Sequence, residues 1–177
     1  MLDRSLRIST SGLPVCEPPP DPRPAVPVLD RCTPSRVGHG TVVLYYAFPE
    51  SKPFPPLRLK ALIYNEGTRA GTTHLLIRAP VTVPVPTVII ARLDISRISA
   101  GRYGTEAVLR MPTIAEGYGL TELVSLTLDR EYELHGKVHG VATLRCPDGK
   151  FQASGEAAFV DGTTASAEAI RACRTAG

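Results

Sequence analysis

The sequence predicts an all-β fold, an antiparallel β-sandwich or barrel of about nine or ten strands, in a single domain of residues 1–177. The 17 prolines and 15 glycines are spread between apolar runs, as expected where every strand must end in a turn. The apolar runs are short and rich in β-branched and aromatic residues. The pairs Asp148-Gly149 and Asp161-Gly162 are strong signals for tight hairpins.

The first half of the chain contains predicted strands separated by proline-rich segments. Residues 1–9 form a first strand with apolar side chains on one face. Residues 10–38 hold the first two cysteines and are too rich in proline for a helix or a central strand. Apolar segments with strand character then follow at 41–48, 57–64 and 74–79, the first of them apolar on both faces.

The second half of the chain predicts an antiparallel meander at its end. The alanine-rich segment 163–173 is ambiguous, because its local propensity favours a short helix whereas the hairpin signal before it favours a strand. With that segment as the last strand, the meander has four strands. The strands predicted in this half are 87–95, 105–111, 123–132, 138–146, 151–160 and 163–173.

Charge and hydropathy exclude two classes of partner. The net charge is only +3, and the basic residues are scattered rather than gathered in a stripe, which argues against nucleic acid. No stretch approaches the ~18 apolar residues that a membrane-spanning helix needs. The opening residues also lack the charged and apolar regions of a signal peptide, which on its own favours the cytoplasm.

The four cysteines favour an oxidising compartment instead. Cys16 and Cys32 form an N-terminal group, and Cys146 and Cys173 form a C-terminal group. Of the three possible connectivities, pairing within each group closes the shorter loops, and a Cys16–Cys32 bridge stabilises by roughly 3 kcal/mol in the chain-entropy model. A zinc site would need ligands two to four residues apart, which are absent, and four buried free thiols are the other alternative.

The C-terminal pair conflicts with a flat meander. There, Cys146 and Cys173 would both flank the start of strand 151–160, about 9.5 Å apart across two strand spacings. A disulfide does not span that distance. Either the chain bends across the end of the sheet, or segment 163–173 is not a regular neighbouring strand.

Several short motifs occur in a recognisable order. They are Gly12-Leu13-Pro14-Val15-Cys16, Cys32 before Val37-Gly38-His39-Gly40, Gly101-Arg102-Tyr103-Gly104-Thr105, and Cys146-Pro147. Together they resemble an uncharacterised family of secreted, disulfide-containing β-domain proteins of high-GC actinobacteria. The resemblance implies a signal peptide upstream of Met1 and strand character for 163–173. It implies no active site, and the segment between the first two cysteines is richer in proline than in that family.

Catalytic and cofactor motifs are not found in the sequence, and no catalytic residue, metal or cofactor is predicted. Phosphate-binding loops, a G-x-S-x-G elbow, an H-E-x-x-H motif and a dinucleotide fingerprint are all absent. His135 and His139 are four residues apart but flank a predicted turn, and His39 and His74 have no acidic neighbour in sequence.

Carboxylates and tyrosines supply the remaining candidates. Asp129, Glu131 and Glu133 are spaced by two on the predicted strand, which suits a glycosidase pair in distance but also a solvated outer face. Tyr45 and Tyr46 are predicted to lie in the core. Three tyrosines are candidates for an exposed binding surface: Tyr103, Tyr118 and Tyr132.

Three functions are therefore compared. The first is a non-catalytic secreted or cell-surface module, structural or binding a protein or a cell-wall component. The second is a β-barrel carrier of a small apolar ligand, suggested by the segments 41–48 and 87–95. The third is a hydrolase, which would need carboxylates to converge in one cleft from among Glu106, Glu116, Asp129, Glu131 and Glu133.

Overall fold

A computed structural model describes residues 1–17, 31–46, 55–83 and 86–173, and these residues confirm the all-β prediction. Short 3-10 helices, η1 (Thr33–Ser35) and η2 (Ala115–Gly117), interrupt the strands. The strands are β1 (Leu2–Asp3), β2 (Leu6–Ile8), β3 (Arg36–Tyr46), β4 (Leu57–Arg69), β5 (Thr72–Val81), β6 (Thr87–Ala100), β7 (Tyr103–Arg110), β8 (Gly119–Leu128), β9 (Glu131–Leu134), β10 (Lys137–Gly140), β11 (Ala142–Leu144), β12 (Lys150–Ala158) and β13 (Thr164–Ala172).

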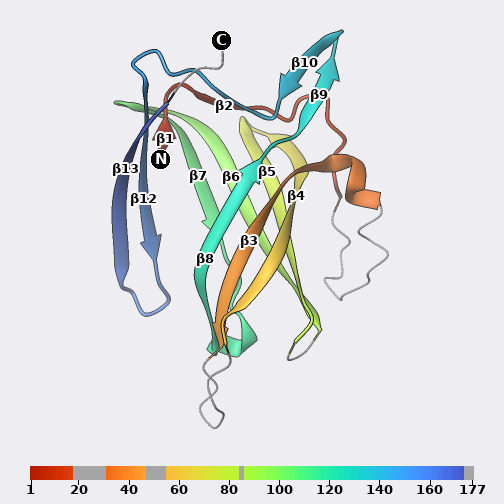
Figure 1. Ribbon diagram of the computed structural model, residues 1–177, viewed down its shortest axis with the longest axis vertical. Helices are drawn as coiled ribbons and strands as arrows, with labels where there is room; N and C mark the ends of the chain where they lie inside the picture. The colour runs from red at the N-terminus through yellow and green to blue at the C-terminus, as the bar shows by residue number, and fades with distance from the viewer. Residues whose placement is uncertain (18–30, 47–54, 84–85, 174–177) are drawn as a thin grey trace.

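Nine of these strands form one antiparallel sheet, which curls into a half-barrel (Figure 1). Its order is β13-β12-β1-β7-β6-β5-β4-β3-β8, so β13 and β8 are its two edges. Two small sheets, β9–β10 and β2–β11, complete the described fold. The predicted first strand 1–9 is divided, because residues 4 and 5 turn and place β1 and β2 in different sheets.

The main hydrophobic core lies on one face of the curled sheet. Alternate residues of β3, β4 and β5 point into it, and Leu44, Ile63 and Leu75 are fully buried there. Burying such a side chain contributes about 1.5–3 kcal/mol. Val37 and Val141 are also fully buried, so the core anchors both the start of β3 and the residue before β11.

The first disulfide covers part of the opposite face. Cys16 and Cys32 are bonded, with their Cα atoms 4.9 Å apart, and they pack with Tyr64 and Leu76 in a second buried cluster. The Cys16 amide donates to the Asn65 carbonyl at 2.7 Å. This second cluster explains why the central strands are apolar on both faces. Of the predicted irregular segment 10–38, residues 18–30 lie outside the described part, and β3 already begins within it.

The predicted four-strand meander is wrong in its connections. Segment 123–132 is divided between β8 and β9, and β8 pairs with β3 instead of the next segment along the chain. Segment 138–146 is likewise divided, since β10 pairs with β9 and β11 pairs with β2. Two hairpins pair as predicted, the short one across the turn at His135-Gly136, β9–β10, and the last one, β12–β13. Val124, Leu126 and Leu128 of β8 are partly buried against the main core, and β3, the strand that β8 pairs with, is far away in sequence.

Segment 163–173 forms a strand despite its helical propensity. All nine residues of β13 pair with β12 in an uninterrupted register from Lys150↔Ala172 to Ala158↔Thr164. The Asp161 carboxylate fixes the turn by accepting hydrogen bonds from the amide and the hydroxyl of Thr163. The hairpin turn and this pairing therefore override local preference.

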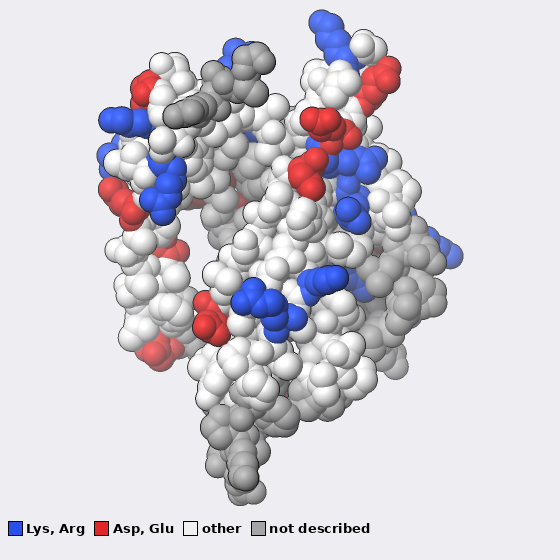
Figure 2. All heavy atoms as spheres, in the orientation of Figure 1, with Lys and Arg blue, Asp and Glu red and all other residues white. Residues whose placement is uncertain are grey.

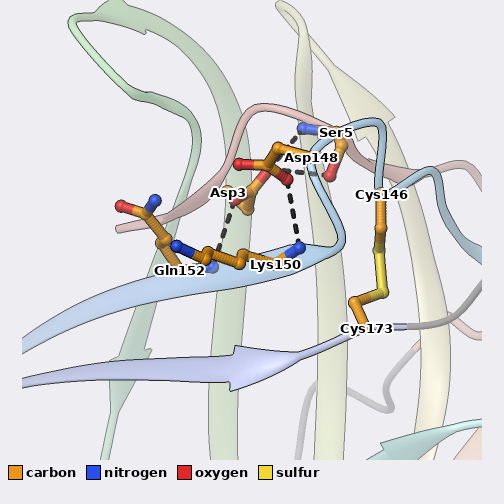
Figure 3. The surroundings of a disulfide bond; sticks show 7 residues. All are labelled: Asp3, Ser5, Cys146, Asp148, Lys150, Gln152 and Cys173. Atoms are coloured by element: carbon orange, nitrogen blue, oxygen red, sulfur yellow. Dashed lines mark hydrogen bonds between the residues drawn. A yellow bond between two sulfur atoms is a disulfide. The ribbon is translucent and has the colours of Figure 1, made fainter.

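The second disulfide joins Cys146 and Cys173, with Cα atoms 6.0 Å apart (Figure 3). A turn brings Cys146 across the end of the hairpin, because the Gly149 amide donates to the Cys146 carbonyl at 3.1 Å. The Cys173 amide in turn donates to the Gly149 carbonyl at 2.9 Å. The bend at residues 146–149 thus resolves the conflict between a disulfide and a regular last strand.

Asp3 ties the hairpin to the N-terminal segment (Figure 3). Its carboxylate accepts hydrogen bonds from the Ser5 amide and hydroxyl at 2.8 and 2.6 Å, and from the Gln152 amide at 3.1 Å. Burial alone would raise the pKa of Asp3, but these hydrogen bonds hold that pKa below its ordinary value. The ionised carboxylate of Asp3 in β1 therefore stabilises the position of β12 by accepting the hydrogen bond from Gln152.

Candidate functional site

A groove of about 290 Å³ opens where β3 begins and the chain passes from β8 to β9. Acidic and basic side chains gather around β9 in the upper right of the view in Figure 2. The groove volume is at the lower end of the range for ligand sites, so it suits a small polar group or one side chain. The groove is lined by Thr33, Arg36, Val37, Gly38, Asp129, Arg130 and Glu131.

The floor of the groove is fixed by backbone contacts. The Arg130 amide donates to the Val37 carbonyl at 3.3 Å, and the Val141 amide donates to the Arg130 carbonyl at 2.9 Å. A Cβ at Gly38 would lie 2.0 Å from the Thr127 carbonyl oxygen, so only glycine permits β8 to approach β3 this closely. The connection between β8 and β9, which carries Asp129 and Arg130, is therefore held against the start of β3 by backbone hydrogen bonds.

The side chains of the groove carry both signs of charge. Arg36 and Arg130 supply guanidinium groups, and Asp129 and Glu131 supply carboxylates. Asp129 also pairs with Nδ1 of His39 at 3.2 Å, where both side chains are about half exposed. Exposed ion pairs of this kind contribute little to stability. These groups therefore remain able to exchange their partners for a charged ligand.

The groove brings together only part of the carboxylate set considered from the sequence. Asp129 and Glu131 both line it, although they do not lie on one continuous strand as predicted, because β8 ends at Leu128 and β9 begins at Glu131. Three candidates are exposed and do not line the groove: Glu106 on β7, Glu116 in η2 and Glu133 on β9.

A second charged cluster lies on the face of the sheet opposite to the main core. Nδ1 of His74 lies 2.7 Å from Asp94 Oδ1, and Arg110 donates to the other oxygen of Asp94. Beside them, Arg92 lies 3.7 Å from the largely buried carboxylate of Glu66. The His74 hydrogen bond lowers the pKa of Asp94, and Arg110 adds to that effect against the opposing influence of burial.

Sequence reasoning missed both histidine–carboxylate pairs, since neither histidine has an acidic neighbour along the chain. His74 and Asp94 stand directly opposite each other in the β5–β6 register. His39 stands opposite Thr127 in the β3–β8 register, two residues before Asp129. The β5–β6 pair could have been found by aligning the predicted strands 74–79 and 87–95 as a hairpin, whereas the other pair depends on a long-range pairing.

The other histidines lie in the β9–β10 hairpin. His135 occupies its turn with a φ of 53°, and the His139 ring lies 5.9 Å from the ring of Tyr132, the residue opposite. No group of three or more His, Cys, Asp or Glu side chains in the described part of the chain is arranged to hold a metal ion. Within the same residues, no helix has the length and apolar character to cross a membrane.

The burial of the tyrosine side chains differs in part from the prediction. Tyr46 is buried as predicted, and burial raises its pKa. Tyr103, expected as a candidate for an exposed surface, is only 7% exposed, and the Arg102 guanidinium lies 5.2 Å from its ring centroid. Tyr118 is exposed, whereas Tyr132 packs partly against the main core. The three tyrosines do not form one binding surface.

The fold and its cysteine pairs define the molecule as an all-β domain with two disulfides, which indicates an oxidising environment. No protein-family model matches the chain, and searches of curated proteins and of solved structures find no significant relative.

Proposed function

We propose that the chain is a non-catalytic, secreted or cell-surface module that binds a peptide-bearing partner, such as a cell-wall component, in the charged groove. The carrying observation is the groove itself, which two arginines and two carboxylate residues line together. The paired cysteines support export, because disulfides persist in oxidising compartments.

The chemistry of the groove suits a ligand with charges of both signs. Arg36 and Arg130 are able to bind a ligand carboxylate in bidentate geometry. Asp129 and Glu131 are able to accept hydrogen bonds from a ligand ammonium group. Cell-wall peptides carry both kinds of group. An apolar ligand would leave these charges without partners, which disfavours the carrier hypothesis for this groove.

The test is an NMR titration of the ¹⁵N-labelled protein with soluble muropeptides. We expect saturable shifts at Val37, Gly38 and Glu131, and a loss of binding of at least tenfold in the double variant Arg36→Ala/Arg130→Ala. Arg58→Ala, which removes an exposed arginine of β4, serves as the matched control and should bind normally. Absence of groove shifts at millimolar ligand would refute the proposal, and turnover of the muropeptide would favour the hydrolase instead.

A further inference from the structure

Among the residues that the structure describes, no strand pairs with the outer side of the edge strand β13. All nine of its residues are exposed, and it pairs only with β12. The hairpin β12–β13 forms the left wall of the half-barrel in Figure 1, and Figure 2 shows open space between it and the rest of the molecule. The edge is thus accessible to another strand.

The backbone groups that face outward can be assigned from the hairpin's hydrogen bonds. The Phe159 amide donates to the Thr163 carbonyl, and the Cys173 amide donates to the Gly149 carbonyl, both at 2.9 Å. Residues with odd numbers on β13 therefore face β12. Because successive residues of an antiparallel strand face opposite sides, the even-numbered ones present their N–H and C=O groups outward. These are Thr164, Ser166, Glu168, Ile170 and Ala172.

This edge lacks three of the features that natural sheets use to prevent edge pairing, although it carries the charged residues Glu168 and Arg171. β13 contains no proline, no lysine and no bulge in its register with β12. Toward its C-terminal end it also exposes Ile170, with 57% of the residue accessible. The opposite edge of the sheet is different, since β8 has an irregularity in its register with β3 and η2 contacts it. Only the β13 edge is therefore open to regular pairing among the described strands.

The β12–β13 hairpin also makes few contacts with the rest of the sheet. β12 meets β1 through the single pair Leu2↔Ala153 and a few hydrogen bonds. An isolated two-stranded hairpin is marginally stable, whereas a third strand makes the unit stable. A strand added to β13 would supply that third strand and cover Ile170.

We propose that this strand is β13 of a second copy, paired antiparallel about a two-fold axis at Ala169. In this register Glu168 stands opposite Ile170 of the second copy, and Ser166 stands opposite Ala172. A register centred on Glu168 would place two carboxylates directly opposite, which is destabilising. The Ala169 register avoids that repulsion, and each Glu168 keeps its ion pair with Arg102 of its own copy, at 2.9 Å.

The side chains near the axis permit the approach. On one face Ala167 and Ala169 are small, and Arg171 stands opposite Ala167 of the second copy. On the other face Ile170 gains an apolar contact with the methylene groups of Glu168. The four outward-facing residues from Ser166 to Ala172 exchange backbone hydrogen bonds with their counterparts. Two half-barrels are thereby joined into one continuous sheet, in an isologous interface that closes.

Sedimentation equilibrium over a concentration series tests the proposal on the intact oxidised protein. We expect a monomer–dimer equilibrium and slower amide exchange at Glu168 and Ile170 as concentration rises. Ile170→Lys should abolish the dimer, because edge lysines oppose pairing. Val138→Lys, at a site that is 73% exposed on β10, is the matched control and should leave it intact.

A cysteine placed at the two-fold axis tests the proposed pairing register. This test does not depend on whether the Ile170→Lys variant folds correctly. Opposed residues of a non-hydrogen-bonded pair have Cα atoms about 4.5 Å apart, which suits a disulfide. Ala169→Cys should therefore form a covalent dimer on oxidation. Ser166→Cys should not, since the two cysteines would lie about 20 Å apart along the strands. A protein that stays monomeric at millimolar concentration, or equal crosslinking of the two variants, would overturn the proposal. Muropeptide binding in the groove is measured separately and does not depend on this result.

Discussion

Replacing both Cys146 and Cys173 by alanine is expected to favour local unfolding of the β12–β13 hairpin, because this disulfide closes the open end of the hairpin. The disulfide closes a segment with a sequence separation of 27, for which the chain-entropy model gives about 3.6 kcal/mol. The hairpin's remaining attachments are weak. They include the pairing with β1, the hydrogen bond from Gln152 to Asp3, the exposed ion pair of Glu168 with Arg102, and a long hydrogen bond from the Tyr103 hydroxyl to Glu168.

This loss of free energy predicts how much faster the amide hydrogens of the hairpin exchange with solvent. A loss of about 3.6 kcal/mol in the local opening free energy corresponds to roughly 400-fold faster exchange. We expect this acceleration in β12 and β13, measured by hydrogen–deuterium exchange at a concentration where the protein is monomeric. Amides of Leu44, Ile63 and Leu75 should keep their protection, because the main core does not include the hairpin.

The first disulfide supplies the control. Its sequence separation of 16 gives about 3.1 kcal/mol in the same model. Cys16→Ala/Cys32→Ala should accelerate exchange around Tyr64 and Leu76, where that bridge packs, and leave the hairpin unchanged. Unaltered hairpin exchange after loss of Cys146–Cys173 would refute the reasoning, as would equal acceleration throughout the sheet.

Three further predictions concern stability, each measured by urea unfolding. Gly38→Ala should cost at least about 3 kcal/mol, because its Cβ would meet the Thr127 carbonyl at 2.0 Å, whereas Gly155→Ala, with open space around it, should change little. Leu75→Ala in the core should cost about 2–5 kcal/mol, and Leu120→Ala, 59% exposed, less than about 0.5 kcal/mol; equal costs would contradict the assigned core. Asp94→Asn should destabilise at neutral pH. Because the folded pKa of Asp94 is lowered, its contribution is present above the ordinary carboxyl pKa and is lost as pH falls through the folded value. The difference between wild type and Asp94→Asn should therefore shrink in acid, and a constant difference would exclude this origin.

Local sequence patterns predict where the strands of this protein lie better than they predict which strands pair with each other. Apolar segments bounded by proline and glycine are placed within a few residues of β4, β5, β6, β7 and β12. The Asp161-Gly162 signal marks the β12–β13 hairpin as predicted, whereas Asp148-Gly149 forms a turn but no hairpin, because β11 pairs with β2 and not with β12. The pairings β3–β8 and β2–β11 join segments far apart in sequence, so no hairpin signal announces them. The expected meander fails for that reason.

The segment 163–173 shows how tertiary context decides an ambiguous sequence. Alanine favours a helix in isolation, yet the Asp161-Gly162 turn and the nine paired positions of β12 determine a strand. The same hairpin end brings Cys146 to Cys173, although in a flat meander two strand spacings would separate them.

The groove was only partly visible in the sequence. Asp129 and Glu131 stand out by their spacing, but Arg36 and Arg130 are ordinary isolated arginines along the chain. What unites the four residues is the approach of β8 to β3 at Gly38, and that contact requires the long-range register. A charged site assembled from strands far apart in sequence is therefore recognised only once the fold is known.

The assignment to an oxidising compartment is tested most directly by alkylation and mass measurement of the protein from its native cells, without reductant. We predict no alkylated cysteine, together with proteolytic fragments that link Cys16 to Cys32 and Cys146 to Cys173. Alkylation of all four thiols before reduction would contradict both the disulfide frame and the secreted function proposed on it.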